Sequence, residues 1–485
     1  MDKNDVKKRT LRGLVWKFLE RVSSQLIALV ISVIIARILS PEDYSVVSIV
    51  TVFFAFANVL VAGGLNSALI QKKNSEDEDY STVLHISVLL SVVCYGLLFF
   101  LAPWVAKLYR QQMLVAIFRV MGLIIPINAV KAVWCAKISA SLKFKKFFFS
   151  TLIGTVISGV VGVVMAYQGY GPWALVVQQM SSALIGTIVV MATTKIRITY
   201  GICWSRLKVL FDYGWKVLVS SLIKTIYQEL NPLIIGLKFD AVSLSYYTKG
   251  RSFPNFVSAT TSYTLSAVLF PALSKFQDDK AALLRYTRLF VRQASFLAFP
   301  MMLGFFAVAE NFVKLVLTDK WLPAIPYIRI FCVSMMFDMI HSGNCETIKA
   351  MGKSSVYLIM EIIKKTAYFV VIALFVFYGE TPQMLAFSAI VCTLIATVVN
   401  SIPNIQLIGY SLGKQLADLL PNLITAAIMC VAVLLVGRLK LATGLLLALQ
   451  IFTGVVVYLI ENILIKSPSL KFMLESLYKI ARKKL

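Results

Sequence analysis

Residues 13–50 read GLVWKFLERVSSQLIALVISVIIARILSPEDYSVVSIV, and this stretch decides the class of fold. Its apolar run from Leu14 to Leu39 exceeds the roughly 20 residues that a helix needs to cross a bilayer. The run is also too long for the apolar part of a secretory signal peptide, and no small-residue cleavage site follows it. The residues Ser-Pro-Glu-Asp at 40–43 supply a turn, and a second apolar run starts at Tyr44. The stretch therefore predicts two membrane helices joined by a tight turn.

The rest of the chain repeats this pattern. Hydrophobic residues make up 59% of the 485 residues and charged residues only 15%, whereas a soluble globular chain carries about 25% charged residues. A soluble fold could not bury so much apolar surface, so the composition excludes a soluble enzyme. We predict an all-α integral membrane protein with about 14 transmembrane helices. The predicted spans are 13–39, 44–71, 81–107, 113–140, 147–168, 172–195, 213–238, 243–274, 286–309, 322–350, 354–378, 382–407, 418–437 and 441–465.

The loops between these spans carry unequal charge. With the N-terminus in the cytoplasm, the inner loops and tails hold 28 Lys and Arg residues, and the outer loops hold 7. Because basic loops stay on the cytoplasmic side, this bias predicts a multi-pass protein of the cytoplasmic membrane with both termini in the cytoplasm. Basic residues that mark the cytoplasmic loops, or that bind an anionic substrate, then explain the net charge of +25. We therefore expect no nucleic-acid partner.

A weak internal repeat divides the chain. Trp16-Lys17 opens the first predicted helix and Trp215-Lys216 opens the seventh, an offset of about 200 residues. Two six-helix halves inserted in the same orientation would produce this repeat, and such halves suit alternating access around a central cavity. We therefore predict an N-lobe (1–198, helices 1–6), a C-lobe (199–410, helices 7–12), a C-terminal helix pair (411–466) and a basic amphipathic cytoplasmic tail (467–485) that lies on anionic lipids.

Residues for enzymatic chemistry are scarce. The seven cysteines are scattered without a CxxC pair, and the histidines are only two, His85 and His341. No nucleotide-binding or zinc-binding motif occurs in the chain. A membrane glycosyltransferase or polymerase would normally need long extramembrane loops with catalytic carboxylates, and the outer loops here are too short. We therefore expect a protein that is not an enzyme and that uses no metal or cofactor.

Thirteen basic residues lie inside the predicted spans. A charge at mid-membrane costs about 2.5–3.5 kcal/mol, so such side chains usually face a cavity or a partner. Five of them lie roughly 10 Å or deeper from either end of their span, and we predict that they line a cationic cavity shared by the lobes. Ion pairing and snorkelling to the membrane surface stay open as alternatives for each residue. The five are Arg21, Lys131, Lys224, Lys249 and Arg251.

Acidic residues inside the spans are fewer, and they suggest coupling to an ion gradient. A carboxylate within a helix bundle can take up a proton or Na⁺. Glu229 lies near the middle of the seventh span, and Asp338 has His341 three residues later, so these three residues are candidates for ion coupling. Counter-ion and polar-packing roles are the alternatives. Glu361 has Lys364 at i+3, and this spacing favours a local ion pair.

Several motifs resemble one family of membrane transporters. Residues 13–50, followed by ALIQKKNSEDEDYS at 68–81, are similar to the start of the polysaccharide exporters in the multidrug/oligosaccharidyl-lipid/polysaccharide (MOP) flippase superfamily. Within it they look most like the colanic-acid and teichuronic-acid exporter group, related to the Wzx flippases. SYYTKGR at 245–251, LFPALS at 269–274 and LTDKW at 317–321 resemble the second-lobe pattern. The resemblance implies a bilobed, MATE-like fold.

The same resemblance implies a function. A flippase of this group moves an undecaprenyl-diphosphate-linked oligosaccharide, the repeat unit of a polysaccharide, across the bacterial cytoplasmic membrane by alternating access, coupled to an H⁺ or Na⁺ gradient. Its implied partners are this lipid-linked substrate, membrane lipids and the polysaccharide polymerase machinery, and the five deep cations would bind the diphosphate. The alternative is a multidrug or cation antiporter of the same superfamily. An antiporter predicts an acidic cavity, which the three basic residues and single Glu of the first span oppose.

Overall fold

The computed structural model describes residues 3–72, 75–141, 144–274, 276–277 and 279–482, and within these ranges every regular element is a helix. The predicted all-α class is therefore confirmed. Five cations of the charge comparison, Lys73, Lys143, Lys275, Lys483 and Lys484, lie outside the described residues. The helices are α1 (Lys3–Ile38), α2 (Pro41–Ala62), α3 (Leu65–Gln71), α4 (Asp77–Leu108), α5 (Met113–Gly122), α6 (Ile124–Ala140), α7 (Phe144–Tyr167), α8 (Pro172–Thr193), α9 (Trp204–Lys238), α10 (Ala241–Ser274), α11 (Lys280–Phe312), η1 (Val313–Leu317), η2 (Asp319–Ala324), α12 (Ile325–Met335), α13 (Asp338–Ala350), α14 (Ser354–Tyr378), α15 (Pro382–Ile408), α16 (Leu412–Val436), α17 (Thr443–Leu464) and α18 (Pro468–Arg482).

Eleven stretches of the described chain are long and apolar enough to cross a membrane, against the prediction of about 14 spans. The helices α9, α10 and α14 coincide with the three remaining predicted spans, but they are not among the eleven. Each is long and carries charged side chains: Lys224 and Lys364 lie near the middle of α9 and α14, and Lys249 lies in the first third of α10. Charged side chains, and in α10 also many Ser and Thr residues, therefore separate these three helices from the apolar eleven, since polar residues oppose insertion.

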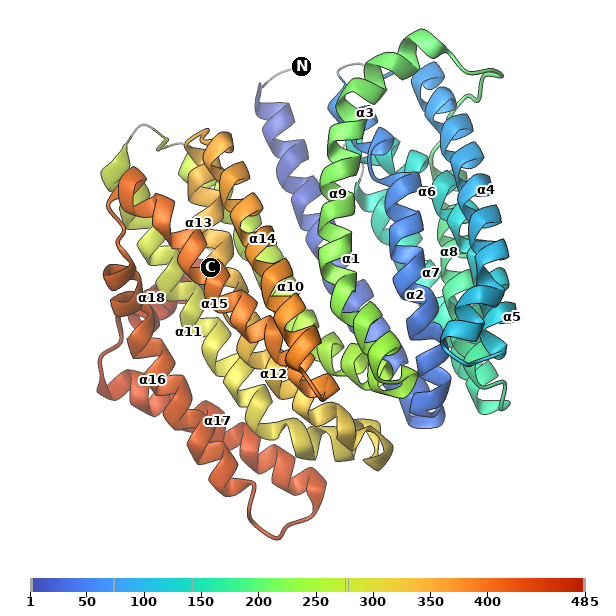
Figure 1. Ribbon diagram of the computed structural model, residues 1–485. Coiled ribbons are helices and arrows are strands. Elements are labelled where there is room, and N and C mark those ends of the chain that lie inside the picture. The colour runs from blue at the N-terminus through green and yellow to red at the C-terminus, as the bar shows by residue number, and fades with distance from the viewer. Residues whose placement is uncertain (1–2, 73–74, 142–143, 275, 278, 483–485) are drawn as a thin grey trace. The chain divides into compact units, whose positions relative to one another are not determined.

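The helices pack into two compact units, residues 1–245 and residues 246–485. In the first unit α2 packs on α4, α5, α6, α8 and α9, and α7 packs on both α1 and α8 (Figure 1). A Cβ atom on Gly64 would lie 2.5 Å from the Gly214 carbonyl oxygen, so two glycines let α9 approach the start of α3 closely. Packing thus places α9 with the first unit. The predicted boundaries at 198/199 and 410/411 follow the helix repeat instead, and they stay predictions.

Helix α11 is central to the second unit. It packs on α12, α13, α15, α16 and α17, and Figure 1 shows α16 and α17 side by side in the C-terminal part of the chain. Ala294 and Ala298 are 0% and 1% exposed at the contact face of α11, where small side chains allow close helix approach. Helices α16 and α17 lie within the predicted C-terminal pair, and the helix α18 lies within the predicted tail.

The break predicted at 40–43 is present but shorter: α1 ends at Ile38, and α2 already begins at Pro41. Ser40 caps α2: its hydroxyl accepts a hydrogen bond from the Asp43 amide at 3.2 Å, and the Asp43 carboxylate accepts one from the Ser40 amide at 2.9 Å. This reciprocal capping satisfies two of the backbone donors that a helix start leaves open. The same carboxylate lies against Gly171, whose φ of 54° suits glycine, just before Pro172 begins α8.

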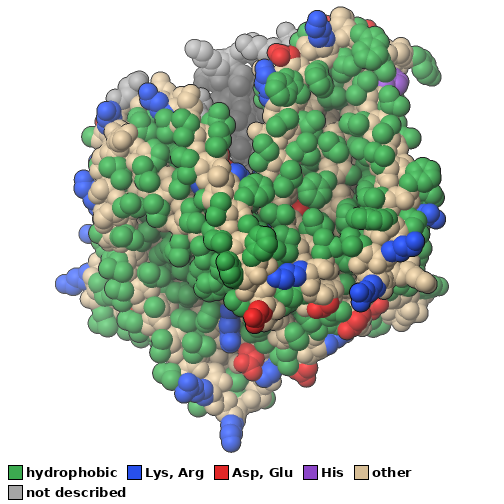
Figure 2. Space-filling model, viewed as in Figure 1, with side chains coloured by type: hydrophobic (Ala, Val, Ile, Leu, Met, Phe, Trp, Pro, Cys, Tyr) green, Lys and Arg blue, Asp and Glu red, His purple; other side chains and the backbone are tan. Residues whose placement is uncertain are grey.

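Apolar side chains cover most of the visible surface, while Lys and Arg gather mainly near its edges (Figure 2). Phe100, Leu97 and Phe377 are 82%, 67% and 83% exposed, on helices of the predicted spans. Apolar surface of this extent marks a membrane-facing protein, because a water-soluble monomer rarely exposes large contiguous apolar patches. The exposed surface therefore agrees with a multi-pass membrane protein.

Candidate functional site

The first unit contains four of the predicted site residues on three helices. Arg21 lies half-buried on α1, and Lys131 lies half-buried on α6. The Lys131 ammonium nitrogen is 2.8 Å from the position that a Cβ atom on Gly186 of α8 would occupy, so the missing side chain makes room for this cation. On α9, Lys224 is exposed and Glu229 is half-buried. The structure therefore places each of these four side chains, and their predicted roles stay predictions.

Lys249 and Arg251 of α10, in the second unit, have different surroundings. The Lys249 side chain is buried, and its ammonium lies 5.6 Å from the ring centre of Trp321 and 6.0 Å from that of Phe253. Arg251 is half-buried and lies 6.0 Å from the ring centre of Phe331. The two cations therefore diverge, as their spacing in an ideal helix requires. A buried ammonium over aromatic faces is stabilised by cation–π attraction.

A polar cluster inside the second unit joins three helices. Ser258 of α10 donates a hydrogen bond to the Asp338 carboxylate of α13 at 2.7 Å, and Arg251 lies within electrostatic range of that carboxylate. The His341 ring bonds the Thr397 hydroxyl of α15 at 2.8 Å. We call Arg251, Ser258, Asp338, His341 and Thr397 the inner polar cluster. In the described part of the chain its acid and its imidazole each bond a hydroxyl rather than one another.

The inner polar cluster continues towards α14. Lys364 forms an ion pair with Glu361, which confirms the local pair that their i+3 spacing predicted. Lys364 also lies within electrostatic range of His341. Two carboxylates, Asp338 and Glu361, thus lie with an imidazole and two cations in one region of the second unit, and such a region can hold or release a proton.

A second buried network, which sequence reasoning missed, fastens α16 to α11. The Asp418 side chain is 1% exposed. It accepts hydrogen bonds from Arg288 Nε and Nη2 at 2.7 and 2.8 Å, from Arg292 Nε at 2.8 Å and from the Tyr410 hydroxyl at 2.9 Å. The sequence held one indication of this network: Arg288 and Arg292 are four residues apart, and this spacing puts both side chains on one face of a helix. Their partner lies about 130 residues away, so the spacing alone could not identify it.

The motif ALIQKKNSEDEDYS also acquires a structural role. Asp79 is fully buried and accepts hydrogen bonds from Lys72 at 2.6 Å and Arg206 at 3.3 Å. Arg206 also donates to Glu76 at 2.7 Å, and its hydrogen bonds to Glu76 and Asp79 raise its pKa above the ordinary value for arginine. Lys137 forms an ion pair with Asp77. The acidic start of α4 therefore holds the ends of α3, α6 and α9 together.

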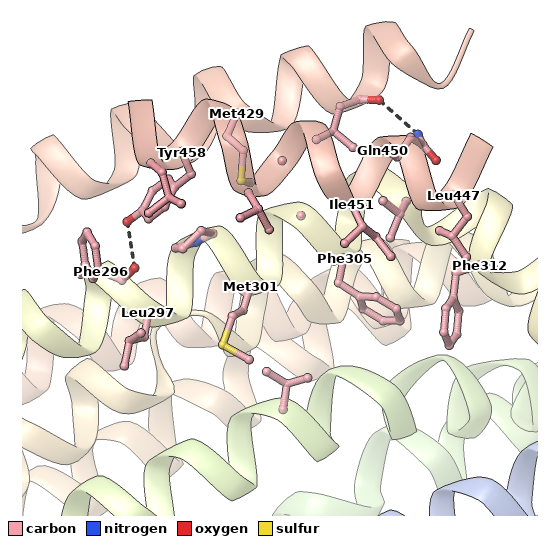
Figure 3. Close-up of a pocket in the computed structure, with 18 of the residues that line it drawn as sticks. Phe296, Leu297, Met301, Phe305, Phe312, Met429, Leu447, Gln450, Ile451 and Tyr458 are labelled. Carbon is pink, nitrogen blue, oxygen red and sulfur yellow. Dashed lines mark hydrogen bonds between the residues drawn. The ribbon is translucent and has the colours of Figure 1, made fainter. Parts of the chain in front are cut away.

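An apolar pocket of about 560 Å³ opens between α11, α16 and α17 (Figure 3). The polar groups at its wall are already bonded: the Tyr458 hydroxyl donates to the Phe296 carbonyl at 2.8 Å, and the Gln450 amide donates to the Val433 carbonyl at 3.1 Å. Met301 and Phe305 of α11 also line the pocket. The pocket therefore suits a hydrocarbon ligand, since an apolar group entering it breaks no polar contact.

Comparison with known proteins places the chain in a family. Residues 34–326 match the family described as polysaccharide biosynthesis protein. The chain belongs to this family. It is 24% identical over 413 residues to an "uncharacterized membrane protein in cps region" of Klebsiella pneumoniae, covering 82% of this chain and 81% of that one. It is 23% identical over 417 residues to the succinoglycan biosynthesis transport protein ExoT of Rhizobium meliloti (strain 1021), covering 86% and 82%.

Solved structures give the fold type. The lipid II flippase MurJ in an inward closed conformation matches with a TM-score of 0.72 at 15% identity, over 94% of this chain and 99% of that one. The fold is therefore of the MurJ and MATE type. Together with the family, this confirms the resemblance to polysaccharide exporters of the MOP superfamily. Of these similar proteins, ExoT is named a transport protein and MurJ a flippase, which agrees with the predicted transporter rather than an enzyme.

Proposed function

We propose that this transporter flips an undecaprenyl-diphosphate-linked oligosaccharide across the bacterial cytoplasmic membrane by alternating access. Membership of the polysaccharide biosynthesis family supports a glycan precursor as the cargo. The observation that carries the proposal is the excess of basic side chains along the membrane helices. A diphosphate carries about two negative charges and needs several strong hydrogen-bond donors, which Arg and Lys supply.

The residues proposed to bind the diphosphate differ in access. Arg21, Lys131 and Arg251 are half-buried and Lys224 is exposed, so these four retain contact with space that a ligand could enter. Lys249 is 5% exposed and covered by aromatic rings. Its part in binding depends on a conformation that uncovers its ammonium, which alternating access would provide.

The lipid part of the substrate needs an apolar environment. The pocket of about 560 Å³ between α11, α16 and α17 supports this, because its wall is apolar and its polar side chains are bonded internally. A polyprenyl chain placed along it would stay out of water while the glycan crosses. The C-terminal helix pair would then belong to the lipid side of the transport path.

Ion coupling is proposed for the inner polar cluster. Asp338 and His341 lie on α13 among hydroxyl groups, with Arg251 close to the carboxylate, so uptake of H⁺ or Na⁺ would change the charge that Arg251 meets. Glu229 on α9 is the third candidate. Charge loss beside a substrate-binding arginine would link the ion gradient to the anionic cargo.

The proposed topology includes the three long helices that are not among the clearly apolar spans. Helices α9, α10 and α14 would also cross the membrane, which gives fourteen spans with both termini in the cytoplasm. The loop charge bias supports this orientation. The polysaccharide polymerase machinery is the proposed recipient of the cargo on the outer side. A multidrug antiporter is less well supported, since the basic first helix opposes a cationic cargo.

The proposal is tested in a deletion strain of the source bacterium. We expect lipid-linked oligosaccharide to accumulate on the cytoplasmic face and the polysaccharide to disappear from the surface, and the intact chain to reverse both effects. Uptake of cationic dyes is measured in the same strains. Unchanged glycan export together with faster dye accumulation would contradict the flippase and favour the antiporter.

A further inference from the structure

A second, polar pocket lies in the second unit where α11, α16, the end of α17 and the start of α18 meet. Its volume is about 200 Å³. Its polar lining consists of Arg292, Asp418, Asn422, Thr425, Asn462, Ser467 and Ser469. It is separate from the apolar pocket and from the inner polar cluster, so neither of those proposals accounts for it.

The ion-pair network beside this pocket carries a net positive charge, although the lining itself holds one arginine and one carboxylate. Asp418 is saturated, since it receives hydrogen bonds from two arginines and from a tyrosine hydroxyl. A carboxylate with all its acceptors occupied has little capacity left for a metal cation. The two arginines outnumber the single carboxylate, so one positive charge remains uncompensated within the group. Arg292 lines the pocket with its side chain 40% exposed, whereas Arg288 does not line it.

The start of α18 adds donors from the opposite wall. This helix begins at Pro468, and its first turn leaves backbone N–H groups without partners inside the helix. Ser469 is 4% exposed and Ser467 is 9% exposed, and both line the pocket. In the described residues neither hydroxyl makes a hydrogen bond. Serine side chains in residues as buried as these usually have a hydrogen-bond partner, and here the pocket is the space in which a ligand would supply one.

These features together select an anion. The pocket offers hydrogen-bond donors from a helix N-terminus, from two hydroxyl groups and from an arginine with spare N–H groups. The oxygen atoms of a tetrahedral phosphate group can accept hydrogen bonds from all of these donors. We propose that this pocket binds a phosphate group, the head of an anionic phospholipid or free phosphate. The phosphate site is independent of the proposed diphosphate binding, because none of the five proposed diphosphate ligands lines the pocket, whereas the lipid source rests on the proposed topology.

The location favours the lipid source. In the proposed topology the start of α16 and the end of α17 lie at the cytoplasmic surface, where anionic lipids concentrate. Helix α18 carries apolar Leu470 buried against the protein and exposed Lys471 on another face. A lipid phosphate held at the start of α18 would fix this helix to the membrane surface.

The test uses the full chain in detergent and native mass spectrometry. Phosphatidylglycerol, phosphatidylcholine and inorganic phosphate are the three probes. We expect one tightly held phosphatidylglycerol per chain, and Arg292→Gln to weaken it about tenfold or more through loss of a charge-assisted hydrogen bond. Ser469→Ala, which keeps the ion-pair network, should weaken it less but measurably. Competition by inorganic phosphate without lipid selectivity would assign the site to free phosphate.

Two matched controls separate binding from folding. Arg288 pairs with Asp418 as Arg292 does but does not line the pocket, so Arg288→Gln removes the same ion-pair contact without changing the pocket wall. Lys471→Gln removes an exposed charge from α18. Both should retain phosphatidylglycerol. Equal losses in Arg288→Gln and Arg292→Gln with no effect of Ser469→Ala would overturn the proposal. So would equal retention of the two lipids with no competition by phosphate.

Discussion

Replacing Asp418 by Asn should destabilise the protein strongly. The substitution keeps the shape of the side chain but removes the charge that two arginines share inside the second unit. Removing one partner of a buried ion pair costs about 3–5 kcal/mol. Arg288 and Arg292 keep 35% and 40% exposure, so water recovers part of that loss. We therefore expect a cost of about 2–4 kcal/mol in the free energy of unfolding.

The assay is denaturant unfolding of the purified protein in detergent, followed by tryptophan fluorescence, with the thermal midpoint as a second measure. The control is Asp212→Asn, because Asp212 pairs with Lys216 at 3.5 Å on an exposed face of α9. A surface pair of this kind contributes about 0–1 kcal/mol. If the free energy of unfolding of Asp418→Asn lies within about 0.5 kcal/mol of that of the intact chain, the network does not hold α16 on α11, which would refute the prediction.

Three further predictions concern topology, packing and transport. Reporter fusions after Lys146 and Gly379 should report cytoplasm and outside respectively, because of the loop charge bias, and an outside signal at Lys146 would refute the orientation. Gly64→Ala should lower the thermal midpoint, because the new Cβ atom would lie 2.5 Å from the Gly214 carbonyl oxygen of α9. Gly96→Ala is the control: no atom lies within 4 Å of the Cβ position on Gly96, so this variant should be neutral or mildly stabilising. Arg251→Gln should impair glycan export, and Arg251→Lys should retain part of it; equal export by both at normal expression would remove Arg251 from the binding role.

Much of the architecture could be predicted from the chain alone. Hydropathy and length mark the membrane helices, because a span must satisfy its own backbone in lipid. The helix break next to Ser40 and the Glu361–Lys364 pair are present as predicted, since capping and i+3 contacts involve residues only one helical turn apart. The resemblance in residues 13–50 and 68–81 agrees with the family that the chain belongs to.

The three predicted spans that are not among the eleven clearly apolar ones show where hydropathy alone is insufficient to identify a membrane helix. α9, α10 and α14 have the length of a span, but charged side chains, together with the Ser and Thr residues of α10, remove them from the clearly apolar set. Whether such a charge faces lipid, a partner or a cavity depends on the neighbouring helices. Lys249 illustrates this, because Trp321, far from it in sequence, helps to bury its ammonium.

What the sequence by itself determined is therefore the class of protein, its helices and the family, all of which depend on local periodicity, composition and motifs. Only the tertiary structure decided that Arg206 belongs to Glu76 and Asp79, and that Arg288 and Arg292 share Asp418. These partners lie about 130 residues apart in sequence. No spacing rule reaches that far: which residues meet is decided by which helix faces pack together, and packing depends on the shape of every side chain between them.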